Sequence, residues 1–553
     1  MGAQQLRTEV VETDVLCVGG GPAGLCAAIR AAELGAKVVV ADKSNTLRSG
    51  DAGMGNDHFR CYIPEVHGDD VEVIVKETAV SQSAGHRPES FVRLFLQNST
   101  GMVKRWDQWG IPMKYEGKYE FAGHGYAGHP LILLHYSGQD TKLVLTKQAL
   151  KTGVKIVNRV MIHDLLTEGG KVWGAIGVDT REPRIIVFKA KSVILATGKF
   201  MRLFPGATPG WLFNVNTSPI NTGDGRAMAY RAGCELTNLE LSARWAGPRY
   251  FARNGKGSWM GVLRDPHGKP VGPFVTKPDK HTGDMTSDIY RDLFDDYTKS
   301  GRGPVYMDMA GISKEDYDYM KYWLIHEANT PILDFMEQEG ADPREHPIEF
   351  MTYGMFTPGG IYYNEKGETP LKGLFAAGDE FYAFVIAGAA VFGWLSGESA
   401  ATYAKQAPSP EMSKAQPRVD EIKALCETIL ARDEGGAAWQ EANIAVQQVM
   451  ADYCGLVRSE TLLQAGLSHF RRLKQKIHGS LKAQNQHELT RCLEVLNLVD
   501  LGELTFIAAQ ERKETRPGHR RVDHPYTNPL LNDQLLTIKK VDGKPATQWM
   551  KRK

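Results

Sequence analysis

The sequence predicts an α/β protein with a Rossmann-like dinucleotide-binding domain, an inserted α+β capping domain and a C-terminal helical domain. Three observations favour this division. A glycine-rich turn follows a short apolar strand near the N-terminus, a middle segment rich in Arg, Tyr, Gly and Pro loses clear periodicity, and helical spacing dominates the last part. A chain of 553 residues is too long for one core, so roughly two to four domains are expected. We place the dinucleotide-binding domain at 1–235 and 350–407, the capping domain at 236–349 and the helical domain at 408–553.

The N-terminal segment carries a dinucleotide-binding fingerprint. A buried strand, Val15–Val18, turns into an alanine-rich helix through Gly19, Gly21 and Gly24. Glycine is needed because a side chain would block the turn, the approach of a pyrophosphate or the helix–strand contact. The helix N-terminus offers free N–H groups to the phosphates. Asp42 ends the next strand about twenty residues on, where a carboxylate can accept hydrogen bonds from a ribose 2′-OH. This segment therefore predicts that an adenine dinucleotide is bound.

The other elements follow along the chain. Apolar residues recur at helical spacing between Glu72 and Trp109. A β-rich stretch and two buried runs ending near glycines predict strands within 154–160, 172–178, 185–188, 192–198 and 373–379. The last of these returns the chain to the dinucleotide-binding core. Near the C-terminus, an apolar stripe typical of bundle packing consists of Leu463, Leu467, Phe470, Leu473 and Ile477.

Composition and charge exclude several function classes. Lys and Arg number 66 against 65 Asp and Glu, and the net charge of +1 argues against nucleic-acid binding or a membrane-surface patch. The first dozen residues lack an apolar core, and the longest apolar run, Val385–Leu395, is broken by glycines, so we expect a soluble, cytoplasmic protein without direct membrane insertion. Seven scattered cysteines without a CxxC pair predict neither disulfides nor an iron–sulfur cluster in this chain.

Four further segments match motifs of one flavoprotein family: 193–198, 222–229, 373–379 and the charged run 512–523. With the fingerprint they follow the order seen in fumarate reductase, succinate dehydrogenase and aspartate oxidase, which the chain resembles over nearly its whole length. The resemblance implies a Rossmann-like FAD-binding domain with FAD as cofactor. No second GxGxxG follows a strand, so a bound nicotinamide is not expected. The fingerprint and the resemblance together predict the cofactor contacts Gly19, Gly21, Pro22, Ala23, Gly24, Asp42, Lys43, Ser49, Gly50, Gly55, Thr197, Gly198, Asp224, Gly378, Asp379, Gly388 and Ala389.

Within this superfamily, Arg48–Gly55 and Gly301–Asp308 are most similar to the alpha subunit of adenylylsulfate reductase. In fumarate reductase and succinate dehydrogenase a histidine follows the Arg-Ser pair and carries the flavin covalently, whereas this sequence has Gly50. The resemblance therefore implies FAD that is held non-covalently. The match to adenylylsulfate reductase is incomplete, since Met355 stands in place of a histidine and Arg60 in place of an active-site asparagine.

Three departures argue against fumarate chemistry. Trp245 stands where the family has a dicarboxylate-binding histidine, and Met355 replaces a second histidine. No arginine lies at Thr282–Asp284, where the proton-donating arginine of the family would fall. Hydride transfer to a C=C bond needs an acid on the opposite face and cations that clamp both carboxylates. The resemblance thus implies the architecture and the flavin site, but not fumarate as the substrate.

The inserted domain is expected to roof a flavin cleft and to supply the substrate contacts. Arginines there favour a small anionic substrate, because a guanidinium grips a carboxylate, sulfonate or phosphate with two hydrogen bonds. The alternative for these arginines is a surface ion pair. His124 and His129 lie in a glycine-rich loop without a carboxylate or cysteine spaced to complete a metal site, so no metal is expected. The candidate catalytic residues are Arg60, Arg244, Trp245, Arg249 and Tyr353, with Tyr250 nearby.

Three functions are compatible with these observations. The first is a flavoprotein subunit that exchanges electrons between a small anionic substrate and a ferredoxin-like iron–sulfur partner. The second is a free-standing flavin dehydrogenase or reductase acting on a C–C bond. The third is a flavin electron-transfer subunit with no substrate of its own. A partner is expected to dock near Lys43–Arg48, just before the flavin loop, although a charged solvated loop explains that segment equally well.

Overall fold

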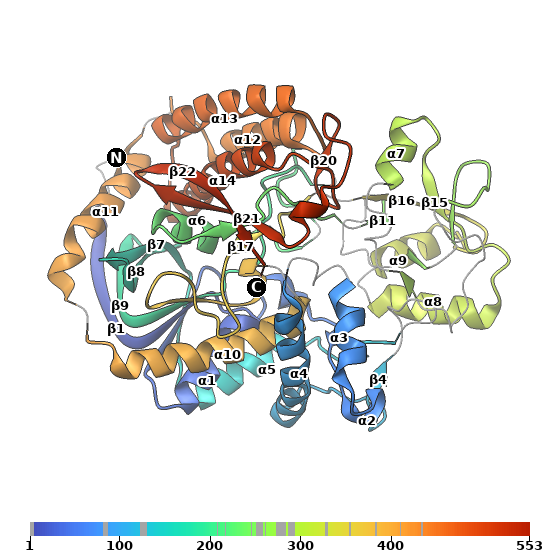
Figure 1. Cartoon of the computed structure of the whole chain (residues 1–553), viewed down its shortest axis with the longest axis horizontal. Coiled ribbons are helices and arrows are strands. Elements are labelled where there is room, and N and C mark those ends of the chain that lie inside the picture. The colour runs from blue at the N-terminus through green and yellow to red at the C-terminus, as the bar shows by residue number, and fades with distance from the viewer. Residues whose placement is uncertain are drawn as a thin grey trace.

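The structure is a computed structural model, shown in Figure 1. It describes residues 5–80, 87–121, 130–206, 208, 210–215, 217–244, 246–249, 258–259, 262–271, 284–285, 293–326, 330–352, 355–381, 384–409, 411–432 and 435–552. No helix within these ranges is long and apolar enough to cross a lipid bilayer.

A seven-stranded sheet forms the centre of the main body. Its strand order is β6 (Lys155–Asn158), β2 (Val38–Asp42), β1 (Arg7–Val18), β9 (Arg184–Leu195), β8 (Lys171–Asp179) and β7 (Val160–Glu168), with β18 (Leu374–Ala376) also paired to β9. The strands β6, β2, β1, β9 and β18 run parallel, and β8 and β7 continue antiparallel. The central stretches of the parallel strands, such as β2 and the second half of β1, are apolar runs, as expected where a sheet is covered on both faces.

Helices α1 (Pro22–Glu33), α5 (Thr141–Lys151) and α10 (Val385–Gln406) cover one face of this sheet (Figure 1). Close contact between α1 and α10 depends on two glycines of α10. A Cβ on Gly393 would lie 2.3 Å from the Ala23 carbonyl oxygen, and a Cβ on Gly397 would lie 2.3 Å from that of Ala27. Both approaches are too short for any side chain, so this interface requires glycine.

Several expected elements have different limits in the structure. β1 begins at Arg7 instead of near Val15, because its polar first half pairs with β9 over the whole strand. The strands expected at 185–188 and 192–198 are one strand, β9. The helical stretch from Glu72 to Trp109 contains α3 (Val71–Val80) and α4 (Glu89–Trp109). Local periodicity indicated the element types, while sheet pairing decided where the strands end.

The C-terminal part is helical, with α12 (Trp439–Cys454), α13 (Glu460–Ser480) and α14 (Gln486–Glu511) lying above the sheet in Figure 1 and α11 (Gln416–Ala431) at its left. The stripe from Leu463 to Ile477 lies on α13 and packs into the main core. The chain then forms a hairpin that the sequence did not indicate. Its strands β21 (Gln534–Val541) and β22 (Lys544–Lys551) extend a small sheet with β10 (Leu236–Thr237) and β17 (Gly360–Ile361).

Smaller elements complete the body. A three-stranded sheet follows the fingerprint region, and further short helices and strands connect the larger elements. These elements are η1 (Asp51–Met54), β3 (His58–Arg60), α2 (Pro64–His67), β4 (Glu120–Phe121), β5 (Leu133–His135), α6 (Asp224–Arg231), η2 (Gly378–Phe381), η3 (Met412–Lys414), β19 (Val457–Arg458), β20 (Arg520–Arg521) and η4 (Pro529–Leu531).

A second region projects from the body as a lobe on the right of Figure 1. Its apolar residues, from Val262 to Phe350, form a core cluster separate from that of the body. The predicted domain limit between 349 and 350 falls inside the strand β16. The elements of this lobe are β11 (Ala246–Pro248), β12 (Ser258–Trp259), β13 (Leu263–Arg264), β14 (Asp284–Met285), α7 (Leu293–Lys299), β15 (Val305–Met307), α8 (Lys314–His326), α9 (Thr330–Gln338) and β16 (Ile348–Thr352).

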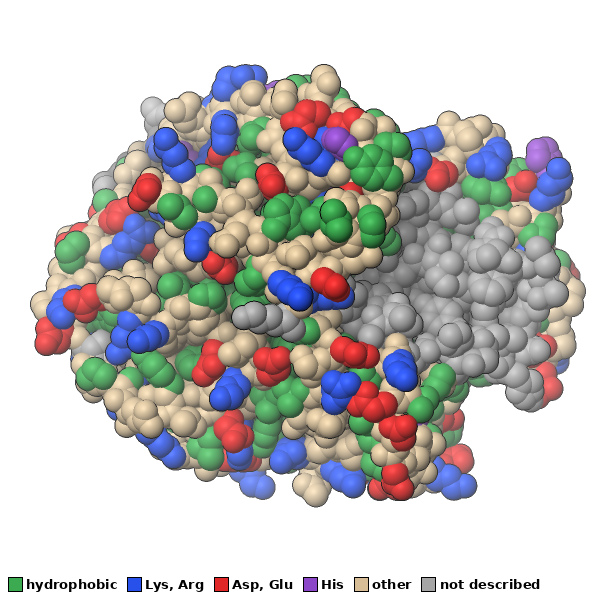
Figure 2. Space-filling model, in the orientation of Figure 1, with side chains coloured by type: hydrophobic (Ala, Val, Ile, Leu, Met, Phe, Trp, Pro, Cys, Tyr) green, Lys and Arg blue, Asp and Glu red, His purple; other side chains and the backbone are tan. Residues whose placement is uncertain are grey.

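Charged side chains of both signs are intermixed over the body. Figure 2 shows Lys and Arg beside Asp and Glu across the described part of this face. The mixture agrees with the net charge of +1. Long-range attraction from this face therefore gives little preference for partners of either sign.

Candidate functional site

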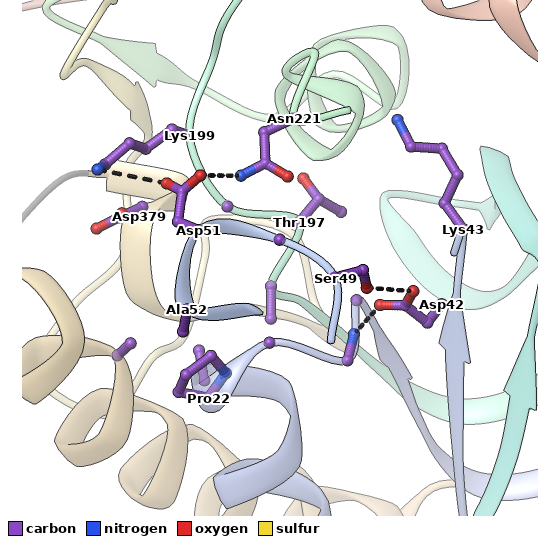
Figure 3. A pocket seen from close by; sticks show the side chains of 18 of the residues that line it. Pro22, Asp42, Lys43, Ser49, Asp51, Ala52, Thr197, Lys199, Asn221 and Asp379 are labelled. Atoms are coloured by element: carbon purple, nitrogen blue, oxygen red, sulfur yellow. Dashed lines mark hydrogen bonds and ion pairs between the residues drawn. The ribbon is translucent and has the colours of Figure 1, made fainter. Parts of the chain in front are cut away.

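A cleft lies at the carboxyl ends of the parallel strands, where ligands bind in open α/β sheets. Its floor is the turn between β1 and α1, and its walls come from the ends of β2 and β9, the loop before η1 and the start of α10. The space between these walls measures about 1130 Å³, part of it open to solvent. Figure 3 shows the cleft with Asp42 and Ser49 at one end and Lys199 and Asp379 at the other.

The three fingerprint glycines meet three separate steric requirements. Gly19 has a φ of +102°, and a Cβ there would lie 2.3 Å from the Ala196 carbonyl oxygen at the end of β9. A Cβ on Gly24 would lie 1.9 Å from the Gly19 carbonyl oxygen. Gly21 differs, because nothing lies within 4 Å of its Cβ position and the residue lines the cleft. Gly19 and Gly24 thus permit the turn, and Gly21 leaves room for a ligand above the helix N-terminus.

Asp42 marks one end of the cleft. Its Oδ2 accepts a hydrogen bond from the Gly20 N–H at 2.7 Å, and its Oδ1 accepts one from the Ser44 N–H at 2.8 Å. The carboxylate is therefore fixed at the tip of β2, where a ribose hydroxyl is expected. Lys142 lies at the same end and donates to the Ser49 carbonyl oxygen at 2.7 Å. Burial lowers the pKa of Lys142 to about 8, and Asp42 acts to raise it.

Lys43 lines the cleft but is held by a buried ion network. Its Nζ lies 2.8 Å from Asp224 Oδ2 and 2.8 Å from Glu494 Oε1 on α14. Glu494 also pairs with Arg202 at 2.9 Å and Arg491 at 2.8 Å. Burial would raise the pKa of Glu494, but the three cations lower it to about 2. The network links the cleft to the helical region and commits the Lys43 ammonium to it. Lys43 therefore does not contribute to the surface loop where partner docking was expected.

Thr197 stands at the end of β9, with its polar groups used inside the cleft wall. Its N–H and hydroxyl donate to Glu380 Oε1 at 2.6 and 2.5 Å, and its Oγ1 accepts from the Gly225 N–H at 3.0 Å. Arg226 lies 3.6 Å behind Glu380. Burial raises the pKa of the Glu380 carboxyl, and Arg226 acts to lower it. These contacts hold the strand end and the start of α6 together.

The end of the cleft opposite Asp42 carries three charged groups. Lys199 Nζ lies 3.3 Å from Asp51 Oδ2, and Asp379 lies beside them (Figure 3). Burial raises the pKa of Asp379 to about 6, while Lys199 acts to lower it and Asp51 to raise it. Asp379 Oδ1 has no hydrogen-bond partner among the described residues. That oxygen is available to accept a hydrogen bond from a ligand hydroxyl.

Most of the predicted cofactor contacts line this cleft. Four do not border it in the described part of the chain: Gly24, Gly55, Gly378 and Gly388. Gly24 serves the turn, and Gly378, with a φ of +65°, approaches Ala23. The residues that line it as predicted are Gly19, Gly21, Pro22, Ala23, Asp42, Lys43, Ser49, Gly50, Thr197, Gly198, Asp224, Asp379 and Ala389.

Five other polar or charged residues that line the cleft were not predicted from the sequence: Asp51, Asn56, Lys142, Lys199 and Asn221. Two of them had a signal in the sequence. Asp51 directly follows the flavin-loop glycine Gly50, and Lys199 directly follows Thr197-Gly198 at the end of a buried strand. Charged residues at the carboxyl end of a parallel strand are candidates for ligand contact.

The predicted substrate residues occupy different places. Arg244 is buried, with 6% of its surface exposed, and the residue before it pairs with Phe356. Arg249 forms an ion pair with Glu349 on the neighbouring strand of the lobe, and Arg60 ends β3 in a half-buried position. None of the three borders the cleft as it is described. Trp245, Tyr250, Tyr353, His124 and His129 lie outside the described residues.

The residues present fit FAD. The cleft runs from Asp42, the predicted ribose contact, past open space above Gly21 to the Asp379 oxygen that has no hydrogen-bond partner among the described residues. Gly50 offers no side chain for covalent attachment. Within the described ranges no three metal-binding side chains gather.

Comparison with known sequences gives the same result. The FAD binding domain family matches residues 14–386, and the fumarate reductase flavoprotein C-terminal family matches residues 444–552. A fumarate reductase (CoM/CoB) subunit from Methanothermobacter marburgensis is 25% identical over 97% of this chain and 99% of its own length. L-aspartate oxidase from Vibrio cholerae is 27% identical over 93% of this chain and 96% of its own.

Solved structures share the fold. Adenylylsulfate reductase from Archaeoglobus fulgidus superposes with a TM-score of 0.84 at 22% identity, covering 99% of this chain and 97% of its own. Quinol fumarate reductase from E. coli gives a TM-score of 0.80 at 20% identity, covering 98% and 97%. The predicted fold class, the predicted resemblance and FAD as the cofactor are confirmed.

Proposed function

We propose that this chain exchanges electrons between a small anionic substrate and an iron–sulfur partner protein. The chain belongs to the FAD binding domain family, and its C-terminal region matches the fumarate reductase flavoprotein C-terminal family. The chain is an FAD-dependent oxidoreductase of the family that includes fumarate reductase, aspartate oxidase and adenylylsulfate reductase. The finer assignment depends on the end of the cleft farthest from Asp42 and on the cysteines of this chain.

The observation that carries the substrate class is the place of Arg244. Its neighbour Ala243 exchanges backbone hydrogen bonds with Phe356 at 2.8 and 3.0 Å. Phe356 packs in one cluster with the cleft residue Val385, and its ring centre lies 5.6 Å from Lys199 Nζ. A buried guanidinium on the segment that pairs with Phe356 supports a site that orients a carboxylate, sulfonate or phosphate through two hydrogen bonds. Arg249 contributes less to this role, because Glu349 already balances its charge.

The partner is inferred from the route by which electrons would leave the flavin. FAD, when bound, can take two electrons from a substrate and pass them on one at a time. The seven cysteines are all buried and contain no CxxC pair, so the electrons leave to a separate acceptor. The relative from Methanothermobacter is itself named as a subunit, which supports an acceptor held in a complex.

The function is tested by isolating the tagged chain from its native host under anaerobic conditions. We expect an iron-containing protein to co-purify, and we expect acid precipitation to release all of the flavin. The complex is then mixed with succinate, L-aspartate, or sulfite with AMP, while flavin absorbance is followed, and reoxidised flavin is tested with fumarate and reduced viologen. An anion that bleaches the flavin in an Arg244-dependent manner supports the proposal.

Two results would contradict the proposal, and a third, fumarate turnover, would overturn only the exclusion of fumarate as the substrate. Recovery of the chain alone, fully active with a diffusible quinone and free of iron, favours a free-standing enzyme. Fumarate turnover within about tenfold of an ordinary fumarate reductase means that the replacements at Trp245 and Met355 do not exclude fumarate. Bleaching by the partner alone, with no response to any anion, favours an electron-transfer subunit. The matched control is Arg249→Ala, since Arg249 is paired with Glu349.

A further inference from the structure

Lys199 and Asp51 form a charge pair inside the cleft. Lys199 follows the turn at the end of β9 and is only 3% exposed. Its Nζ lies 3.3 Å from Asp51 Oδ2 and 5.6 Å from the centre of the Phe356 ring. Figure 3 shows both side chains at the end of the cleft farthest from Asp42. A buried lysine is uncommon, and here its charge faces a ligand cavity.

Asp51 is fixed independently of the lysine. Its Oδ1 accepts hydrogen bonds from the Ser218 N–H at 2.9 Å and from the Asn221 Nδ2 at 3.0 Å. The carboxylate therefore keeps its place whether or not Lys199 carries a charge. Because Lys199 is buried and Asp51 is half-buried, their fields decay less with distance than those of fully exposed groups.

The cofactor's two halves are assigned to the two ends by the fingerprint. The pyrophosphate belongs above Gly21 and the adenosine toward Asp42, as the β1–α1 turn requires. The flavin half must then extend toward Lys199, Asp51 and Asp379. The carboxyl of Asp379 lies at that end and responds to both charges. Burial raises the pKa of Asp379, Lys199 acts to lower it and Asp51 acts to raise it. The two residues thus act in opposite directions on any charge that develops there.

Reduction develops such a charge. Adding two electrons and one proton to the flavin ring leaves one extra negative charge on it, and nearby protein charges set how favourable that is. We propose that Lys199 and Asp51 are an opposed pair that sets the reduction potential of bound FAD, with Lys199 raising it and Asp51 lowering it. In a chain with Gly50 at the attachment position, Lys199 supplies a means of raising the potential that needs no covalent bond. The inference depends on FAD and on neither the substrate nor the partner.

The test measures the midpoint potential of the purified FAD-loaded protein by equilibration with reference dyes. For Lys199→Met we expect the oxidised form to be favoured by about tenfold or more, which is a fall of about 30 mV for a two-electron couple. For Asp51→Asn we expect a rise of similar size, since asparagine can still accept the hydrogen bonds from Ser218 and Asn221. Lys199→Arg should keep the wild-type potential.

The matched control is Lys142→Met, which removes a buried lysine at the Asp42 end of the same cleft. It should change the potential by less than about threefold in the equilibrium, or about 15 mV. Shifts of the same sign in Lys199→Met and Asp51→Asn, or no shift in either, would overturn the proposal, because a structural role does not predict opposite signs. If Lys199→Met fails to fold, the midpoint potentials of Asp51→Asn and Lys199→Arg test the proposal instead. An Asp51→Asn potential that falls or stays unchanged overturns it. A Lys199→Arg potential that falls by about 30 mV also overturns it.

Discussion

The body and the projecting lobe differ in how their interiors are held together. The body joins its sheet, α1, α10 and the C-terminal helices in one continuous apolar core, and it buries ion networks such as that of Lys43 and Glu494. The lobe has a smaller core of its own. Among the described contacts, polar pairs such as Tyr322 with His135 and Arg520 with Asp296 join it to the body. The cofactor site lies in the body and the lobe has its own core, so a substitution in one region can change that region without unfolding the other.

The largest expected effect is in the cofactor site itself. Gly21→Val should abolish FAD binding while the body still folds, because the valine Cβ enters open cleft space and the backbone at Gly21 is extended. The isopropyl group would occupy the space that a pyrophosphate needs. The ratio of FAD to protein after gel filtration, together with the circular dichroism spectrum, checks this.

Gly479→Val is the control for that variant. Gly479 is exposed on α13 and also has open space at its Cβ position. It should retain FAD at the wild-type ratio. A Gly21→Val protein with one FAD per chain would show that the ligand does not pass above this glycine.

The next effect concerns the ion network that ties the body together. Glu494→Gln removes the carboxylate that the buried Arg202 shares with the half-buried Lys43 and Arg491, and loss of one partner of a buried pair costs about 3–5 kcal/mol of unfolding free energy. The control is Glu421→Gln, in a surface pair with Arg418 that is worth less than about 1 kcal/mol. Denaturant unfolding measures both variants, and equal losses would contradict a role for the network.

The stabilisation that Glu494 gives should also depend on pH. Burial acts to raise the pKa of Glu494, but the three cations lower it from 4.5 to about 2. The resulting stabilisation is fully present above pH 4.5 and is lost as the pH falls toward 2. The gap in unfolding free energy between wild type and Glu494→Gln should narrow over that window. A gap that stays constant with pH would mean that the ionised carboxylate is not its source.

The smallest effect on the whole molecule is expected in the lobe. Phe350→Ala removes a buried ring from the lobe core, and such truncations cost about 3–5 kcal/mol locally. The lobe should become sensitive to protease while FAD stays bound to the body. Phe335→Ala, at a half-exposed ring on α9, is the control. Loss of FAD in parallel with lobe cleavage would show that the two cores unfold as one unit.

The sequence by itself determined the fingerprint, the fold class and the family. The glycine requirement at Gly24 is a local steric fact, since a Cβ there would meet the Gly19 carbonyl oxygen in the same turn. At Gly19 the positive φ is local, whereas the contact with Ala196 exists only because β9 lies beside β1. Apolar runs such as Val38–Ala41 likewise predict buried strands without knowledge of their neighbours. Strand limits were less predictable, because β1 owes its polar first half to pairing with β9.

Only the tertiary structure decided what the charged residues do. Lys43 follows Asp42, the predicted ribose contact, in the sequence, yet its ammonium pairs with Asp224 and Glu494, the latter hundreds of residues away. Lys199 and Asp51 are likewise distant in sequence and meet because β9 and the loop before η1 end at the same edge of the sheet. Charge pairing acts through space and carries no periodic signature along the chain, so residue spacing cannot reveal which carboxylate a lysine will face.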